Sequence, residues 1–552
     1  MKYRPFPCGH LLILMAVIAL GCVLRFWNLE MKPLWLDEVI TALFSVGRDY
    51  NDIPVATIIH STQLQDLFVF QEGKSCHEVA LTLAQQSTHP PLFFCLMYRW
   101  LEMSSSWSQP LGWKLRSLSA LLGVGGIIAV YFLARLAFSP TAGIMAAAFT
   151  AVSPFGVYLS QEARQYTLPV FFITLTLLAS IALLKNPPLK TRLLLWLMWG
   201  VCHGLACYSH YFCWLVFAAQ VLLLTLFLPR KHLGILLGMS LGVVWSYSPW
   251  FPILFEHFHS PYTTWLPTPD FITPFVQLFA GWLVMAILLP VEHQPIWSQA
   301  IAALTMLGFA LWLGRHIFPR ITQLYQSPVT HRATLFLGGY ILVILLAYCA
   351  IIYLLQKDIS IAFRYNFTYY PAVCVLFGGA FAIGNSGSGA KPIGFLKRYK
   401  SVIILFLVGV ISSGCVIFNL TFLKPYLPDK VALDLNQIKK PFTVIFSYKD
   451  NLDIALGISY AMALENVPGS DTDWVFLSRE KGYESLWDSI SPLNIKTRDV
   501  WLMMDTGLGK ADFPEPLKLN DGVECKRNLN YYYRTWRSYQ LYECHIPHQT
   551  VV

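Results

Sequence analysis

Residues 11–44 read LLILMAVIALGCVLRFWNLEMKPLWLDEVITALF. An apolar run long enough to cross a bilayer is followed by Trp35 and then by two adjacent carboxylates, Asp37 and Glu38. A charged group at a membrane boundary is costly when it loses water, so such a pair is kept for a partner or for chemistry. The residues after the acids are apolar and helix-compatible, so the pair is also a candidate for an ordinary helix cap.

The composition predicts an integral membrane protein. Of 552 residues, 55% are hydrophobic and only 13% are charged, whereas soluble domains carry roughly 25% charged residues. The net charge of +9 arises from short basic clusters between apolar runs. This pattern is typical of topology signals and argues against nucleic acid as a partner.

Lys2 and Arg4 before the first apolar run resemble a signal peptide, and Cys22 ends a stretch similar to a lipoprotein processing site. Ala19 is a weak residue at the first position of such a site, and ten further apolar segments follow. We therefore expect an uncleaved first transmembrane helix.

The expected fold is mainly α-helical, with about eleven transmembrane helices. The predicted spans are 10–27, 117–138, 142–159, 167–184, 193–210, 211–228, 233–255, 297–314, 334–355, 366–385 and 401–423. Two other apolar stretches, 91–103 and 271–290, are interpreted as interfacial helices, because the basic clusters then fall on alternate connections. This puts the N-terminus in the cytoplasm and the C-terminus outside, in a multi-pass protein of the plasma (inner) membrane.

After about residue 425 the pattern changes to short strands and one amphipathic helix. Residues 426–552 are expected to form a small extracytoplasmic α/β domain of unknown role, and residues 1–425 a membrane domain whose first outer loop is 28–115. Cys525 with Cys544, and Cys76 with Cys95, are candidate disulfides in an oxidising compartment.

This topology brings further polar motifs to the same face as the acids. The turn THPPLFF (88–94) holds His89 rigidly before a helix, and FRYNF (363–367) places Arg364 among aromatics. SQEARQY (160–166) supplies Glu162, Arg164 and Tyr166. Each has a structural interpretation, as a helix entry, a snorkelling arginine or a membrane-edge salt bridge. Together, carboxylates, cations and aromatics at one face predict a site for a phosphate-bearing lipid and an activated nucleophile.

Six motifs in this order resemble the bacterial protein O-mannosyltransferase-like glycosyltransferases (family 39-like), which have the GT-C fold shared by the aminoarabinose transferases of lipid A. The motifs are WLDE (35–38), HPPL (89–92), RSLSALLGV (116–124), SPFGVYLSQEARQYTL (153–168), YSHYF (208–212) and FRYNFTYYP (363–371). The resemblance spans about residues 1–425. The usual RYLLP motif is here RYNFTYYP, with the proline displaced to Pro371.

The resemblance implies sugar transfer from a polyprenyl-phosphate donor to an extracytoplasmic lipid, glycan or protein. By it, Asp37 is the catalytic base and Glu38 its neighbour, while His89, Arg364 and Arg164 hold the donor phosphate. Glu162, Tyr166, His210 and Tyr365 are expected to support them. No nucleotide is required. A divalent metal, which some relatives use, is a candidate cofactor, and His89, His210 and Glu38 are its candidate ligands.

The alternative is a polytopic transporter or lipid-sugar flippase without transferase activity. A transporter would place ionisable residues midway along its spans, whereas here they cluster at one face. An oligosaccharide ligase or polymerase of similar architecture also remains open.

Overall fold

The computed structural model describes residues 8–260, 266–383, 395–438, 441–520 and 523–545. The chain forms two compact units. The helical unit comprises Met1–Met31, Cys76–Met97 and Gln109–Phe422, and the sheet unit comprises Lys32–Ser75, Tyr98–Ser108 and Leu423–Val552. Both elements of the predicted fold class, a helical membrane part and a C-terminal α/β part, are present.

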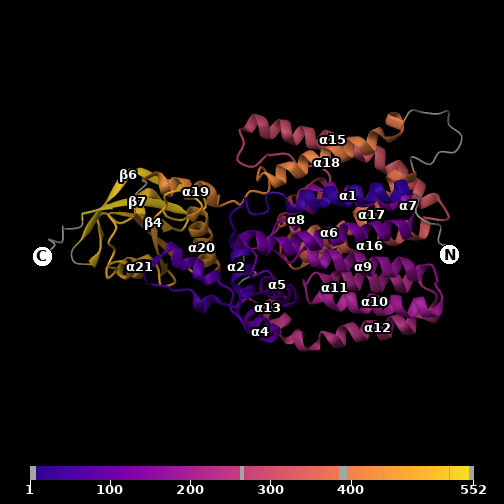
Figure 1. Ribbon diagram of the computed structural model, residues 1–552, viewed down its shortest axis with the longest axis horizontal. Helices are drawn as coiled ribbons and strands as arrows, with labels where there is room; N and C mark the ends of the chain where they lie inside the picture. The colour runs from indigo at the N-terminus through magenta and orange to yellow at the C-terminus, as the bar shows by residue number, and fades with distance from the viewer. Residues whose placement is uncertain (1–7, 261–265, 384–394, 439–440, 521–522, 546–552) are drawn as a thin grey trace. The chain divides into compact units, whose positions relative to one another are not determined.

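Long helices lie side by side in the helical unit (Figure 1). Its α-helices are α1 (Cys8–Phe26), α4 (Cys76–Gln86), α5 (Leu92–Met103, which continues into the sheet unit), α6 (Leu111–Ala137), α7 (Pro140–Val152), α8 (Pro154–Ser160), α9 (Thr167–Leu184), α10 (Leu189–Cys207), α11 (Cys213–Phe227), α12 (Leu233–Ser246), α13 (Phe251–Phe258), α14 (Thr273–Leu283), α15 (Ile296–Gln326), α16 (His331–Leu354), α17 (Tyr370–Ile383) and α18 (Phe395–Ile417). Short 3₁₀ helices are η3 (Arg230–His232), η4 (Ser248–Trp250), η6 (Ile359–Ile361) and η7 (Phe363–Thr368).

Six of these helices, α1, α6, α9, α15, α16 and α18, are long and apolar enough to cross a membrane. Two bent pairs, α7 with α8 and α12 with α13, raise the number to as many as eight. Each of the eleven predicted spans coincides with a helix or a bent pair. However, α11 and α17 are short and α10 is not among the helices apolar enough to qualify, so the count of eleven stays a prediction. The two expected interfacial segments form only the short helices α5 and α14.

The helix axis turns by 61° between α7 and α8. The carbonyls left without helical donors at this break accept hydrogen bonds from a buried arginine. Pro154 lacks the N–H that would continue the α7 ladder. Arg25 of α1 is 1% exposed and donates to the carbonyls of Thr150 at 2.9 Å and Ala151 at 3.0 Å. Ser153 caps α8 by accepting the Gly156 N–H. Broken helices persist inside membrane proteins only where freed carbonyls find such donors.

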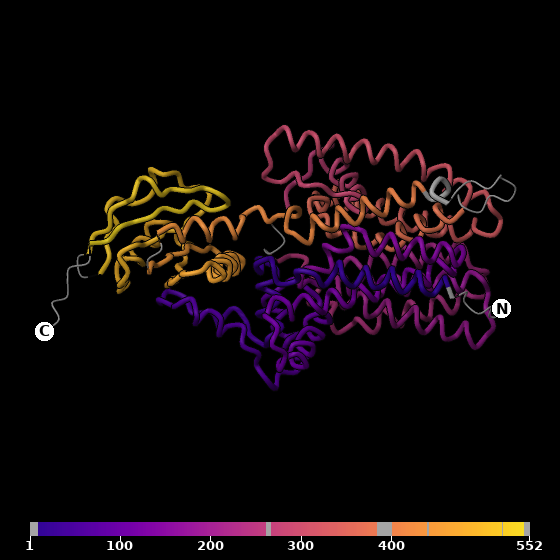
Figure 2. The backbone as a smooth tube through the Cα atoms, turned by 45° about the horizontal axis from the view of Figure 1, so that its top comes forward, coloured from indigo at the N-terminus to yellow at the C-terminus, as the bar shows by residue number. Residues whose placement is uncertain are grey.

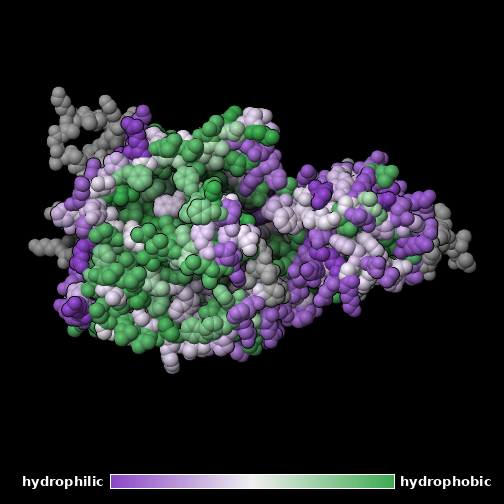
Figure 3. All heavy atoms as spheres, turned by 180° about the vertical axis from the view of Figure 1, so that it is seen from behind, coloured by the Kyte–Doolittle hydropathy of each residue, from purple (hydrophilic) through white to green (hydrophobic). Residues whose placement is uncertain are grey.

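The surface of the helical unit is hydrophobic over the face seen in Figure 3, whereas the C-terminal part is largely hydrophilic. Among the exposed apolar side chains are Leu304 and Phe318 of α15 and Leu346 of α16. Apolar surface of this extent is what lipid tails cover, and the helical unit is therefore the membrane part of the protein.

The sheet unit is built on one seven-stranded sheet in the order β1-β3-β2-β4-β7-β6-β5. Its strands are β1 (Ile59–His60), β2 (Phe442–Tyr448), β3 (Thr472–Ser478), β4 (Asp499–Met504), β5 (Leu517–Lys518), β6 (Glu524–Arg534) and β7 (Ser538–Cys544). The central strands β3, β2 and β4 run parallel and the outer pairings are antiparallel. The strand β2 is an almost fully buried apolar run, as parallel strands covered on both faces require. Its main helices are α19 (Pro428–Leu435), α20 (Asn451–Glu465) and α21 (Tyr483–Ile490).

Part of the first loop is folded into this unit. The helix α2 (Leu36–Ser45) packs on α20, and β1 extends the sheet by pairing with β3. The short helices α3 (Ser61–Gln65), η1 (Tyr50–Asp52) and η2 (Asp66–Phe68) lie in the same segment. Figure 2 shows this indigo-to-purple segment beside the orange C-terminal part. The boundary that composition places at residue 425 thus separates chain segments but not compact units, because strand addition and helix packing leave no compositional mark.

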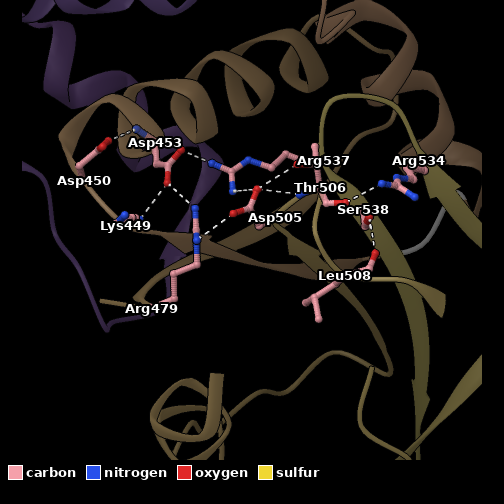
Figure 4. A network of polar contacts seen from close by, with 10 residues as sticks. All are labelled: Lys449, Asp450, Asp453, Arg479, Asp505, Thr506, Leu508, Arg534, Arg537 and Ser538. Carbon is pink, nitrogen blue, oxygen red and sulfur yellow. Dashed lines mark hydrogen bonds and ion pairs between the residues drawn. The ribbon is translucent and has the colours of Figure 1, made fainter. Parts of the chain in front are cut away.

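A network of charges closes the carboxyl ends of the parallel strands (Figure 4). Asp453 of α20 pairs with Arg537 and, at 3.1 Å, with Arg479, which follows β3. Arg479 also pairs with Asp505, which follows β4, at 2.8 Å. Doubly wound sheets commonly bind ligands at this edge. In this protein the arginines and aspartates at that edge are paired with one another.

Both candidate disulfides are present. Cys525 of β6 is bonded to Cys544 of β7, and Cys76 is bonded to Cys95. Among the cysteines whose side chains the structure describes, seven others are free, including Cys202, Cys207 and Cys213 in apolar helices or at their ends. The bonded cysteines fall in the segments predicted to lie outside the cytoplasm, and the free ones in the predicted spans.

Candidate active site

The SQEARQY turn lies between α8 and α9 and is buried throughout. Glu162 is 5% exposed and Arg164 is 2% exposed. The backbone of the turn is held by Ser119, whose hydroxyl donates to the Arg164 carbonyl at 3.2 Å. Charged groups are rarely buried to this extent unless they are paired or functional. The turn therefore lies in the interior of the helical unit and not in an exposed loop at the membrane edge.

His89 is joined to this turn through Arg164, whose Nη2 lies 2.8 Å from His89 Nε2. A guanidinium only donates, so Nε2 accepts and the neutral imidazole carries its proton on Nδ1. That nitrogen then donates to Ser87 Oγ at 2.9 Å. Burial first, and then the positive charge of Arg164, holds the pKa of His89 well below its ordinary value. His89 is thus a neutral residue that orients Arg164.

His210 lies in the turn between α10 and α11, near Arg164 and Arg364. Its Nδ1 accepts the Phe212 N–H at 3.1 Å. Burial, followed by the charges of Arg164 and Arg364, lowers the pKa of His210 to about 3. The turn is also tied to the His-Pro-Pro segment, because the Leu92 N–H donates to the Tyr208 carbonyl at 3.1 Å.

Arg364 is carried by η7, between α16 and α17, and is partly exposed. Its guanidinium carbon lies 5.9 Å from the ring centres of both Tyr166 and Tyr365. These rings also approach His210, at 5.6 Å from Tyr166 and 5.9 Å from Tyr365. The aromatic contacts restrict the guanidinium while leaving it able to bind an anion.

The structure therefore brings together all seven candidate residues of the helical unit. We call His89, Arg164, His210 and Arg364 the basic cluster; Glu162, Tyr166 and Tyr365 accompany it. Because both imidazoles are neutral, the positive charge of the cluster comes from its two arginines. A phosphate group, which favours forked donors, matches this charge.

No group of three or more His, Cys, Asp or Glu side chains that could hold a metal occurs in the described part of the chain. Of the candidate ligands, His89 has both ring nitrogens hydrogen-bonded and His210 has Nδ1 engaged by a backbone N–H. These residues do not fit a metal site.

The two carboxylates belong to the sheet unit, on the first turn of α2. Glu38 is fully buried and its Oε2 accepts the N–H of Trp35 at 3.4 Å, as the third helical residue of a capping box does. Asp37 is partly exposed, and its carbonyl accepts the Thr41 hydroxyl at 2.9 Å. Two adjacent acids thus have different surroundings, one structural and one accessible.

Several polar residues of the region escaped the sequence interpretation. Ser87 orients His89, and the Tyr158 hydroxyl lies close to Glu162 and Arg364. Gln165 is fully buried, and neither atom of its amide has a hydrogen-bond partner within the residues that the structure describes. Tyr158 stands four residues before Glu162, so helical spacing was the one available signal.

Residues 88–250 match the family model of dolichyl-phosphate-mannose-protein mannosyltransferase. Among solved structures, ArnT from Cupriavidus metallidurans in the apo state is 13% identical, with a TM-score of 0.54 over 97% of this chain and 98% of that one. The same protein bound to undecaprenyl phosphate gives 14% identity and a TM-score of 0.51 over the same shares. The oligosaccharyltransferase of Archaeoglobus fulgidus in the apo form is 13% identical, with a TM-score of 0.43 over 90% of this chain and 69% of that one.

No curated protein matches the sequence. The family model covers the HPPL, SQEARQY and YSHYF motifs, and the likeness to ArnT extends the shared fold over nearly the whole chain, including the sheet unit. The resemblance to GT-C glycosyltransferases indicated by the motifs is confirmed.

Proposed function

We propose that this protein transfers a sugar from a polyprenyl-phosphate donor to an acceptor outside the cytoplasm. The observation that carries the proposal is the basic cluster: two arginines, one buried and one caged by tyrosines, with two neutral histidines beside them. A site of this charge suits a phosphate bound to an apolar chain, which an apolar helical unit accommodates. The binding of undecaprenyl phosphate by ArnT, which has the same fold, supports this choice.

In the proposed reaction the acceptor hydroxyl or amine attacks the anomeric carbon in one displacement. Asp37 takes the proton of the attacking group. The bond between the anomeric carbon and the phosphate oxygen breaks, and polyprenyl phosphate leaves with the bonding electrons, so the configuration is inverted. Arg364 and Arg164 stabilise the charge that collects on the leaving phosphate. His89 keeps the Arg164 guanidinium oriented.

Two features support the extracytoplasmic side and the plasma membrane. Both disulfides lie in segments that the distribution of Lys and Arg between the spans assigns to the outer face. Disulfides persist in oxidising compartments. The basic cluster lies in turns on that same predicted face. The acceptor class (lipid, glycan or protein) is left open by these features.

The test is binding of undecaprenyl phosphate to the full-length protein in lipid nanodiscs. Arg364→Ala should weaken binding by about 10- to 100-fold, because a charge-assisted contact of about 1.5–3 kcal/mol is lost. Arg364→Lys should restore only part of it, since lysine keeps the charge but not the fork. Arg332→Ala, an exposed arginine of the same unit, is the matched control. Equal affinity of Arg364→Ala and wild type would remove Arg364 from the donor site.

A further inference from the structure

In the helix that carries Asp37, the N-cap residue makes no capping hydrogen bond with its side chain. This residue is Trp35, and an indole has no acceptor for the backbone N–H groups of a first turn. Glu38 reaches back to the Trp35 N–H, but the N–H of Leu36 still needs an acceptor. Even a usual N-cap residue, such as Ser, Thr, Asp or Asn, accepts from the second or third residue of the helix, so the N–H of Leu36, the first residue, takes its acceptor from elsewhere.

The acceptor comes from a residue 390 positions along the chain. The Leu36 N–H donates to the hydroxyl of Tyr426 at 2.7 Å. Tyr426 is 5% exposed. It belongs to the sheet unit, whose C-terminal segment begins at Leu423, after α18 of the helical unit has ended. Its hydroxyl lies 3.3 Å from the Oγ of Ser459, on α20, and the Ser459 hydroxyl donates to the Leu34 carbonyl at 2.7 Å.

The donor and the acceptor of each of these three hydrogen bonds follow by elimination. The single proton of Ser459 is used on the Leu34 carbonyl, so between the two hydroxyls it is Tyr426 that donates and Ser459 that accepts. The hydroxyl of Tyr426, in turn, accepts from Leu36. Two hydroxyls of the C-terminal domain thus join the N–H of Leu36 to the carbonyl of Leu34, across Trp35. Lys424 completes the clamp, with its Nζ 3.6 Å from the centre of the Trp35 ring.

We infer that Tyr426 and Ser459 are positioning residues for Asp37, and that holding the acidic helix is a function of the C-terminal domain. This inference rests on the proposed role of Asp37 as the base. Asp37 directly follows the clamped residues, so the clamp fixes the backbone from which its short side chain extends. A general base requires close placement relative to the proton that it accepts. The sequence assigns no role to residues 426–552, and the clamp supplies one.

The first test is amide hydrogen exchange of the full-length protein in nanodiscs, measured on peptides covering residues 34–45. Tyr426→Phe and Ser459→Ala should raise the exchange rate of this helix by roughly 3- to 10-fold, because one hydrogen bond of its first turn is lost. Tyr539→Phe and Ser538→Ala are the matched controls. They remove a buried hydroxyl of the same unit that bonds Asp434 or the Leu508 carbonyl instead. Exchange equal to that of the controls would overturn the clamp.

The second test separates positioning from general folding. Cells that make the full-length variants are compared for the amount of the glycosylated product that wild type forms. Tyr426→Phe should lower turnover about 10-fold or more while leaving polyprenyl-phosphate binding unchanged, and it should have no further effect in an Asp37→Asn background. Turnover equal to Tyr539→Phe, or independent effects of the two changes, would overturn the inference. Full activity of Asp37→Asn alone would instead overturn the proposed function.

Discussion

Two adjacent carboxylates at the start of α2 divide between structure and chemistry. Glu38 is fully buried and holds the N–H of Trp35, whereas Asp37 keeps an accessible side chain. The sequence alone made both acids candidates for a cap. Helical geometry, which turns successive side chains by about 100°, is what separates them.

Glu38→Gln should therefore affect stability more than turnover. The amide oxygen still accepts from Trp35, but the charge that favours a helix N-terminus is lost, at a cost of about 0.3–1 kcal/mol. We expect a lower thermal midpoint of the full-length protein and a turnover within a few-fold of wild type. A variant that is folded like wild type yet inactive would make Glu38 the base.

The neutral histidines of the basic cluster predict a pH dependence of stability. An unfolded histidine titrates near 6.5, whereas the pKa of His210 is lowered to about 3 and that of His89 is lowered well below 6.5. Below pH 6.5 the unfolded chain binds protons that the folded protein does not, so the free energy of unfolding falls as the pH falls.

From pH 7.5 to pH 5.0 this amounts to about 2 kcal/mol for His210, and His89 contributes in the same direction. The thermal midpoint in nanodiscs should drop over this range, and His210→Gln should reduce the drop. His259→Gln, at the exposed end of α13, should leave it unchanged. A midpoint that is the same at both pH values would contradict the neutral state of these histidines.

At the scale of elements, the bent span α7–α8 depends on Arg25, which stands in the first predicted span. Its guanidinium bonds the carbonyls of Thr150 and Ala151, where the α7 ladder stops. These carbonyls have no water to turn to inside the membrane part of the protein. The break positions the SQEARQY turn, so a residue outside the basic cluster supports its geometry.

Arg25→Met should keep the volume of the side chain and remove its donors. Leaving buried carbonyls without hydrogen bonds costs about 1–3 kcal/mol each, so the variant should lower the thermal midpoint and the yield of folded protein. Arg135→Met, near the end of α6, is a control for the loss of a cation from a long helix. If Arg25→Met is as stable as Arg135→Met, the bend does not depend on Arg25.

In the sheet unit, Asp453 joins α20 to the ends of two strands through Arg479 and Arg537. Arg537 is 3% exposed. Replacing Asp453 with Asn should destabilise the unit by about 3 kcal/mol, since the buried Arg537 loses its nearer carboxylate and keeps only Asp505, 4.0 Å away. Asp471→Asn, at an exposed ion pair with His60, should cost less than about 1 kcal/mol. Equal costs for the two changes would show that the network contributes no more than a surface pair.

For the whole molecule, hydropathy and charge patterning predicted the helical membrane part and the strands of the C-terminal domain, and the cysteine positions left two candidate disulfides. The motifs also predicted which polar residues of the helical unit come together. What the sequence did not predict depends on partners distant in the chain. No residue near Trp35 indicates that the Tyr426 hydroxyl accepts the N–H of Leu36. The two-residue strand at Ile59 has no periodicity from which its pairing with β3 could be inferred.

The orientation in the membrane is a separate prediction. A reporter fused after Lys400 should be cytoplasmic, and one fused after the last residue should be extracytoplasmic. The reason is that Lys391, Lys397, Arg398 and Lys400 precede the apolar stretch 401–423, the last predicted span. A C-terminal reporter that is active in the cytoplasm would place the sheet unit on the wrong side and remove the eleven-span topology.

The most direct test of the central claim compares cells that carry wild type, Asp37→Asn or no copy of the protein. Mass spectrometry of their extracytoplasmic glycans and glycolipids should reveal a sugar modification that depends on wild type. Asp37→Asn keeps the shape of the side chain but cannot take a proton, so it should lower the modification by about 10²–10⁴-fold while the protein stays folded in the membrane. An undiminished modification with Asp37→Asn, or identical glycans with and without the protein, would contradict the account.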